Sequence, residues 1–85
     1  MKSKHAKTLC AIFTKPTLAS ILFSDVEALV IALGGTVREG AGSRVSLELN
    51  GVRVFPHRPH PGKETQKYTI EEIRDWLAEL GKEPI

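Results

Sequence analysis

The chain begins with a pattern of apolar and polar positions that is typical of a one-sided helix. The apolar stripe falls at positions i, i+3, i+4 and i+7 and comprises Ala6, Leu9, Cys10 and Phe13. Pro16 ends this segment, because a proline disfavours helical geometry in the residue before it. The sequence therefore predicts a short N-terminal helix that stops before Pro16.

A second helix is predicted from a start signal, an apolar stripe and a stop signal. Ser24-Asp25-Val26-Glu27 matches a capping box, in which the first and last side chains satisfy free backbone N–H groups at the helix start. The stripe that we expect to be buried comprises Val26, Leu29, Val30 and Leu33. Gly34-Gly35 follows and supplies the left-handed backbone conformation that commonly ends a helix.

Strict alternation replaces helical spacing in the middle of the chain, as expected for strands with one buried face. Residues 44–49 place three apolar side chains on one face, namely Val45, Leu47 and Leu49. Asn50-Gly51 is the strongest short signal for a β-hairpin, because both turn positions must tolerate positive φ. The return strand spans residues 52–57, after which prolines end the pairing. A short strand at residues 36–39 and a turn at Gly40-Ala41-Gly42 precede this hairpin.

Helical spacing returns in the last part of the chain. A second capping box, Thr69-Ile70-Glu71-Glu72, precedes an apolar face, and Gly81 closes the helix. That face comprises Ile70, Ile73, Leu77 and Leu80, with Trp76 at its edge. The order α-α-β-β-β-α predicts an α+β fold, in which helices pack on one face of a three-stranded antiparallel sheet and leave the other face open. We expect one domain, residues 1–85, because a chain of 85 residues buries a single modest core.

The two-residue turn fixes which residues of the central hairpin face each other, and their numbers sum to 101. Glu48 then faces Arg53, a favourable pair of opposite charges. Arg44 faces His57 on the open side of the sheet. If the first turn contains three residues, Arg38 lies beside Arg44 and completes a row of two arginines and a histidine. Such a row can hold a phosphate, although three solvated side chains screened by salt are the alternative.

Charge is distributed unevenly behind a net value of +2. Residues 36–67 contain six basic and three acidic residues, whereas residues 68–85 contain five acidic and two basic ones. This asymmetry suggests a basic middle that faces a polyanion and an acidic end that faces away, and a randomly decorated surface is the alternative. Cys10 is the single cysteine, which excludes a disulfide framework and favours the reducing cytoplasm. No apolar run is long enough to span a membrane, and no secretory signal is evident.

The segment from Phe55 to Lys63 is rich in histidine and proline. Its prolines restrict the backbone, and histidine exchanges protons near neutral pH. Cleavage of RNA without a metal needs a base, an acid and a cation, and His57, His60, Arg58 and Lys63 supply those types. His57 and His60 could also donate two zinc ligands, but no second pair stands at metal spacing, so we expect no metal. A rigid surface loop without chemistry is the remaining alternative.

From residue 20 to residue 81 the chain resembles the HicA family of toxins from bacterial toxin–antitoxin pairs. The resemblance rests on the order and spacing of five short pieces, namely Val26 to Gly35, Gly42-Ser43, Asn50-Gly51, Pro59-His60-Pro61-Gly62-Lys63-Glu64 and Thr69 to Gly81. It implies a fold like that of double-stranded RNA-binding domains. The first 19 residues, with their basic helix, lie outside the usual core of that family.

The resemblance also implies a toxin that cleaves mRNA and is neutralised by a HicB-type antitoxin covering its active site. HicA proteins usually carry a catalytic histidine directly after Gly-Ser, whereas this chain has Arg44 there. Arginine stays protonated and is a poor general base. Either the activity is lost, or a neighbouring histidine has taken over, and the hairpin register places His57 next to Arg44.

The sequence thus predicts a HicA-like, metal-independent ribonuclease of the cytoplasm without a cofactor, in which His57 and His60 are catalytic. The residues expected to bind RNA are Arg38, Ser43, Arg44, Arg53, Arg58, Lys63 and Lys67. Two alternatives remain open. One is a non-catalytic RNA-binding domain of the same fold, and the other is a protein-interaction module that docks an antitoxin-like partner.

Overall fold

A computed structural model describes residues 1–84, so Ile85, the last residue of the predicted domain, lies outside the described residues. The elements follow in the order α1 (Ser3–Ile12), α2 (Phe23–Ala32), β1 (Thr36–Glu39), β2 (Val45–Leu49), β3 (Val52–Val54) and α3 (Lys67–Glu79). Residues 1–84 thus form three helices and one antiparallel sheet of strand order β1-β2-β3, which confirms the α+β class. No helix in this range combines the length and apolar character that a membrane span needs.

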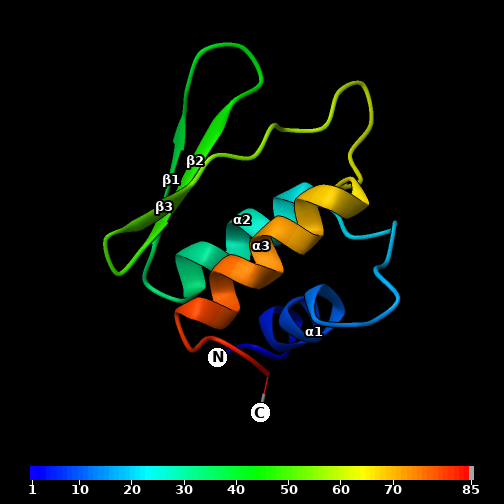
Figure 1. The fold of residues 1–85 in the computed structure, drawn as a ribbon, viewed down its shortest axis with the longest axis vertical. Helices are drawn as coiled ribbons and strands as arrows, with labels where there is room; N and C mark the ends of the chain where they lie inside the picture. The colour runs from blue at the N-terminus through cyan, green and yellow to red at the C-terminus, as the bar shows by residue number, and fades with distance from the viewer. Residues whose placement is uncertain (85) are drawn as a thin grey trace.

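The helices lie on one side of the sheet and form the core with it (Figure 1). β2 is the central strand, and it buries Val45, Leu47 and Leu49 completely or almost completely. The buried apolar side chains of α2 and α3 are Phe23, Val26, Leu29, Val30, Ile70, Ile73, Trp76 and Leu77. α1 packs against these two helices on the side away from the sheet (Figure 1). Stacking an amphipathic strand face against helix stripes buries apolar area, which is the main driving force for folding.

Trp76 is more deeply buried than its predicted place at the edge of the α3 stripe. Its side chain is 5% exposed, and its indole N–H donates a hydrogen bond of 3.2 Å to the backbone oxygen of Val52. A buried tryptophan needs a partner for its single donor, and the end of the hairpin provides one. Trp76 therefore joins α3 to β3.

The buried face of α1 differs from the predicted stripe. Leu9 is buried as expected, but Thr8 and Ile12 are buried with it, whereas Ala6 and Cys10 are exposed. The helix is rotated so that it buries the large Ile12 side chain instead of the small Cys10, which removes more apolar surface from water. Thr8 tolerates this position because its hydroxyl donates to the backbone oxygen of Lys4 at 3.1 Å.

Neither predicted capping box forms. α2 begins two residues earlier, with Leu22 instead of Ser24 as N-cap and without a side-chain cap. Phe23 is buried in the first turn, and its backbone N–H donates to the oxygen of Lys63 at 3.0 Å. α3 begins at Lys67, so Thr69 lies inside the helix and is buried. In both cases tertiary packing overrides the local signal.

The register of the second hairpin is as predicted, and that of the first is not. Glu48 pairs with Arg53, and an isolated bridge joins Arg44 to His57. In the first hairpin Arg38 pairs with Ser46, so the predicted row of Arg38, Arg44 and His57 is wrong. The turn does contain three residues, but they are residues 41–43, because the N–H of Gly40 donates to the oxygen of Arg44 at 2.8 Å. Moving the turn by one residue shifts the pairing by two.

Gly35 provides a test of this packing. A Cβ atom there would overlap the backbone oxygen of Glu48 and approach Val30 Cγ1 to 2.8 Å. We predict that Gly35→Ala lowers the free energy of unfolding by about 3 kcal/mol, because the overlap with backbone forces α2 away from β2. Urea unfolding followed by Trp76 fluorescence measures this change. Gly62→Ala is the matched control, since its Cβ meets nothing within 4 Å, and it should change stability by less than about 1 kcal/mol. Equal stability of the two variants would contradict the close approach of helix and strand.

Candidate functional site

The pairing of β2 with β3 continues beyond the two strands and positions His57. The N–H of Val45 donates to the oxygen of Pro56 at 2.9 Å, and the N–H of Arg58 donates to the oxygen of Ser43 at 2.7 Å. His57 lies between these two bonds, opposite Arg44. Its side chain is exposed, and its Nδ1 atom lies 3.2 Å from the hydroxyl oxygen of Ser43, within hydrogen-bonding distance. The backbone and Ser43 together restrict the orientation of the imidazole ring.

A shallow hollow of about 200 Å³ brings the two predicted catalytic histidines together at the start of α3. Its lining residues are Ser43, His57, Arg58, Pro59, His60, Gln66, Tyr68 and Thr69. A neighbouring hollow of about 350 Å³ shares Ser43, Arg58, Pro59 and His60 and adds Gly42. Gln66 is the N-cap of α3, and no side chain caps this helix end. Free backbone N–H groups and the helix dipole make such an end attractive to anions.

Arg58, predicted to hold phosphate, has its charge satisfied within the protein. Its guanidinium donates to Glu39 Oε1 on β1 and to Glu27 Oε2 on α2, the latter at 2.5 Å. It also lies over the ring of Phe23, 5.9 Å from the ring centre. The hydrogen bonds to Glu39 and then to Glu27 raise the pKa of Arg58 above its ordinary value. Arg58 therefore joins the histidine-rich segment to the sheet and to α2.

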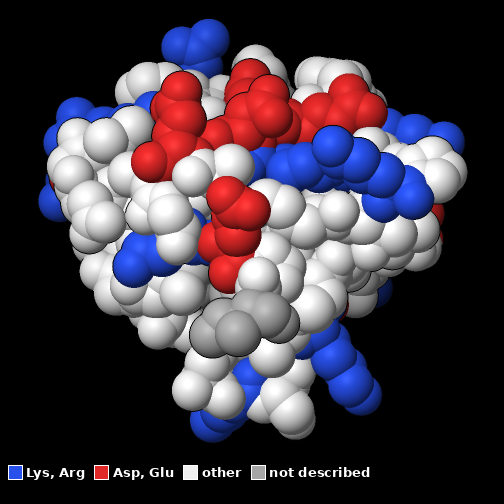
Figure 2. All heavy atoms as spheres, turned by 60° about the horizontal axis from the view of Figure 1, so that its bottom comes forward, with Lys and Arg blue, Asp and Glu red and all other residues white. Residues whose placement is uncertain are grey.

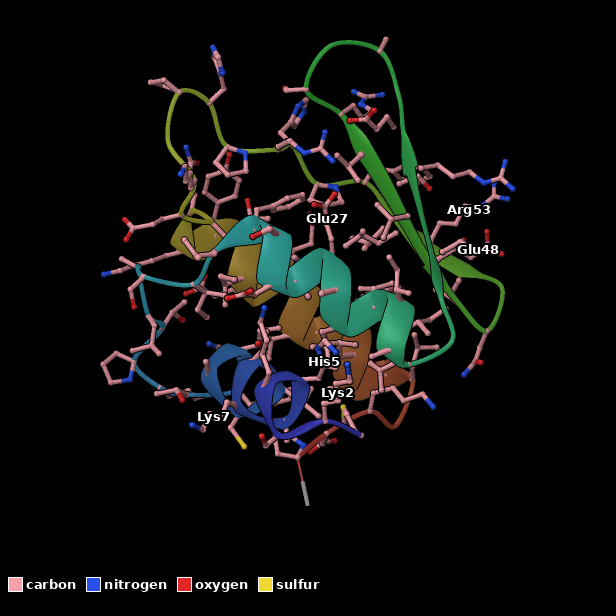
Figure 3. All side chains as sticks on the ribbon, turned by 180° about the vertical axis from the view of Figure 1, so that it is seen from behind. Lys2, His5, Lys7, Glu27, Glu48 and Arg53 are labelled. Atoms are coloured by element: carbon pink, nitrogen blue, oxygen red, sulfur yellow. The ribbon has the colours of Figure 1, made fainter. Side chains whose placement is uncertain are left out.

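The other predicted RNA-binding residues are spread around this hollow and across the sheet. Arg53 pairs with Glu48 at 3.1 Å, and both side chains point away from the helices (Figure 3). Lys63 lines a further hollow between the start of α2 and the histidine-rich segment. Arg38, Arg44, Lys63 and Lys67 are exposed and form no ion pair within residues 1–84. Among the predicted RNA-binding residues, the basic side chains left for an outside anion are therefore Arg38 on β1, Arg44 just before β2, Lys63 in the histidine-rich segment and Lys67 in the first turn of α3.

Carboxylates collect elsewhere on the molecule. Figure 2 shows most acidic side chains of this view gathered in its upper part, with basic side chains directly beside them. The exposed acids of α3 are Glu71, Glu72, Asp75 and Glu79. α3 lies on the helix side of the sheet, opposite the open sheet face (Figure 1). The acidic part of the sequence thus points away from the open sheet face, as the charge pattern predicted.

Sequence reasoning missed several members of the site. Gln66 and Tyr68 line the hollow, but the expected start of α3 at Thr69 placed them in a loop with no assigned role. Glu27 and Glu39 stand 31 and 19 residues from Arg58, and no local pattern indicates such a contact. A long-range ion pair becomes visible only when the elements are packed. The only pattern that singled out Glu27 was the capping box, and it predicted a role at the helix start instead of a contact with Arg58.

Metal ligands do not gather at the histidines. Within residues 1–84, no three side chains of His, Cys, Asp or Glu lie together in the way that a metal site requires. His57 and His60 both line the hollow.

The comparisons with known proteins bear on the part of the chain that builds this hollow. The profile of the family described as HicA toxin of bacterial toxin–antitoxin systems matches residues 23–81, from α2 to the end of α3. No curated protein and no solved structure matches the chain. The matched segment includes Gly42-Ser43, both histidines and the first turn of α3, and it covers well over half of the chain. The chain therefore belongs to the HicA toxin family of bacterial toxin–antitoxin systems.

Proposed function

We propose that this toxin is an endoribonuclease that cleaves mRNA without a metal ion, with the hollow at the start of α3 as its active site. One observation carries the proposal. His57, His60 and Ser43 share one hollow beside an uncapped helix N-terminus, which combines two proton-transfer groups with donors for a phosphate. The family supplies the role of a toxin, and the geometry supports the chemistry.

His57 acts as the general base in this mechanism. Ser43 occupies the Nδ1 side of the imidazole, which leaves Nε2 to accept the proton of a ribose 2′-hydroxyl. The freed 2′ oxygen attacks the adjacent phosphorus, and the bond from phosphorus to the 5′ oxygen breaks. His60, protonated, gives its proton to that leaving oxygen. The products are a 2′,3′-cyclic phosphate and a 5′-hydroxyl, so no water, metal or cofactor enters this step.

The negative charge that develops on the phosphate needs donors in place before the reaction. The backbone N–H groups at the start of α3 and the guanidinium of Arg44, which pairs with His57 across the strands, supply them. Arg38, Lys63 and Lys67 bind phosphates further along the strand, and Arg53 does so while paired with Glu48. Arg58 positions the histidine-rich segment through its ion pairs with the carboxylates of Glu27 and Glu39. Ser43 contributes through its contact with His57.

Arg44 stands where the resemblance placed a catalytic histidine, directly after Gly42-Ser43. In this proposal His57 has taken over the proton transfer, since the bridge between Arg44 and His57 puts the two side chains on neighbouring strands. The same substitution favours a second candidate function, in which the domain binds RNA or its antitoxin without cleaving. Loss of the usual base with retention of the basic side chains is what a binding domain requires.

We further propose that the whole chain acts as one domain in the cytoplasm, with a HicB-type antitoxin that covers the hollow. α1 precedes the matched segment, but it shares the hydrophobic core with it through Leu9 and Ile12. Burial of this helix supports one unit instead of a core with a separate basic arm. Within residues 1–84, Arg44, Lys63 and Lys67 form no ion pair, which leaves these cations for an acidic surface of the antitoxin or for RNA.

The first prediction concerns the histidines. His57→Ala and His60→Ala should each reduce cleavage of single-stranded RNA by about 10²–10⁴-fold, because each removes one proton-transfer group. Wild-type cleavage should persist in excess chelator and leave cyclic phosphate ends, as measured by gel and mass spectrometry of the fragments. His5→Ala on α1 is the control and should cleave like wild type. Cleavage that stops with chelator would refute the metal-free mechanism, and cleavage unchanged in both variants would remove the histidines from it.

A second prediction concerns the substituted position. Arg44→His restores the residue type that the family usually carries after Gly-Ser, so the rate of cleavage should stay equal or rise. In the double variant Arg44→His/His57→Ala, part of the activity lost in His57→Ala should return, because the new imidazole lies opposite the missing one. Single-turnover rates of the four proteins decide the matter. If the double variant is no faster than His57→Ala, the proposed exchange of roles between neighbouring strands is wrong.

A third prediction concerns binding. RNA affinity should fall steeply with salt, because each phosphate contact releases counterions. Lys63→Ala should weaken binding similarly for all sequences and reduce the slope of log Kd against log salt by about 0.7 for single-stranded RNA. Lys82 follows the C-terminal end of α3 and lines a hollow with residues of α1, so Lys82→Ala should leave the slope unchanged. Equal slopes for wild type and Lys63→Ala would contradict a phosphate contact at Lys63.

A further inference from the structure

The open face of the sheet carries a second feature beside the hollow. Since Val45 and Leu47 point into the core, Ser46 between them faces away from the helices. The register places Arg38 on one side of Ser46. Phe55 falls on the other side, because the pairing continues through the bond from Val45 to Pro56. The centre of the open face is therefore a row of an arginine, a serine and a phenylalanine.

Phe55 is exposed although it is a large apolar residue. Its exposed fraction is 55%, whereas Pro56 next to it is buried. Alternation along the strand explains the contrast, since neighbours point to opposite faces. The small Ser46 beside it leaves the ring without a bulky neighbour on the central strand. An exposed phenyl ring on a sheet offers a surface on which another planar group can stack.

The charges around Phe55 favour an anionic partner. Arg38 and Arg44 face the same side of the sheet, and neither has an ion-pair partner within residues 1–84. The nearest acid on this face, Glu48, is already paired with Arg53. An aromatic platform between free arginines matches a strand of nucleic acid, whose bases stack and whose phosphates are anionic. An apolar protein surface would leave both guanidinium groups desolvated and unpaired, which is costly.

We propose that the open sheet face binds single-stranded RNA, with an unpaired base stacked on Phe55 and neighbouring phosphates held by Arg38 and Arg44. This inference rests on the proposed function and names its substrate class, because bases inside a duplex cannot reach the ring. Phe55 and His57 lie two residues apart on one strand, a distance of about 7 Å. The stacked nucleotide is therefore the neighbour of the nucleotide at the hollow, and Phe55 is a positioning residue for cleavage.

The test measures binding of a fully 2′-O-methylated RNA decamer, which cannot be cleaved through its 2′ oxygen. Phe55→Ala and Phe55→Leu should each raise Kd about tenfold or more, since stacking on one aromatic ring is lost. Phe55→Trp should keep the wild-type Kd and show fluorescence quenching on binding. Ile31→Ala is the control, because Ile31 is similarly exposed, at 60%, but lies on α2. A blunt RNA duplex of the same sequence should bind weakly and equally to wild type and Phe55→Ala.

Three results of the RNA-binding measurements would overturn the proposal. The first is a wild-type Kd for Phe55→Ala. The second is a wild-type Kd for Phe55→Leu, which would show an apolar contact without stacking. The third is a loss of duplex binding in Phe55→Ala that parallels its loss of single-strand binding. Self-association abolished by Phe55→Ala, with RNA binding unchanged, would assign the face to a second copy and also overturn it. Failure of the proposed function looks different, since wild type itself would then not cleave RNA, whether or not it binds the methylated decamer. If RNA binding depends on salt but its Kd is unchanged in the Phe55 variants, only the proposal for Phe55 is wrong.

Discussion

Two backbone hydrogen bonds hold the site of this toxin in place, one from Val45 to Pro56 and one from Arg58 to Ser43. They extend the β2–β3 pairing beyond the regular strands into a segment that contains three prolines. A proline cannot donate a hydrogen bond, so the pairing depends on Val45 and Arg58 as donors and on Pro56 and Ser43 as acceptors. His57 lies between the two bonds. Its position thus follows from the core strand β2, whose side chains are fixed by burial.

The ion pairs of Arg58 restrain the histidine-rich segment in addition to the two backbone hydrogen bonds. Its side chain connects β1 and α2, while its N–H group completes the extended pairing. A phosphate that used Arg58 would have to displace two carboxylates, and each would then lose its partner. The structure therefore separates the cations into one that holds the loop and several that remain free. Sequence alone cannot make that division, because all of them are basic residues near a histidine.

The predictability of the molecule differs from element to element for physical reasons. The second hairpin follows from Asn50-Gly51, since a two-residue turn of this composition permits one register. The first hairpin has glycines at positions 40 and 42, so turns at residues 40–42 and 41–43 are both acceptable locally. The two registers differ by two residues and leave every side chain on the same face, so the alternation of buried residues does not distinguish them. The helix stripes of α2 and α3 were predictable from spacing, whereas their start residues were not. Phe23 and Thr69 are drawn into the first turns by packing that a capping signal does not include.

For the proposed site, the sequence singled out the histidines and the segment that carries them, but it did not predict the residues around them. The hollow is made by residues from the β2 entrance, the histidine-rich segment and the start of α3, and only the middle one is a continuous motif. Tyr68 and Gln66 became part of it because α3 starts two residues before the predicted Thr69. The ion pairs of Arg58 span long sequence separations and depend on how α2 lies against the sheet.

The alternation along the extended hairpin has an evolutionary consequence. Because side chains on a strand change face at every residue, a single insertion or deletion in the turn at Asn50-Gly51 would move both Phe55 and His57 to the side of the helices. Such a change would keep Phe55 and His57 in the sequence but turn both side chains away from the open sheet face. Substitutions of individual residues, such as the arginine at position 44, are compatible with the fold because they leave this count intact. Among related chains, the number of residues between Ser43 and His57 should therefore vary less than their identity.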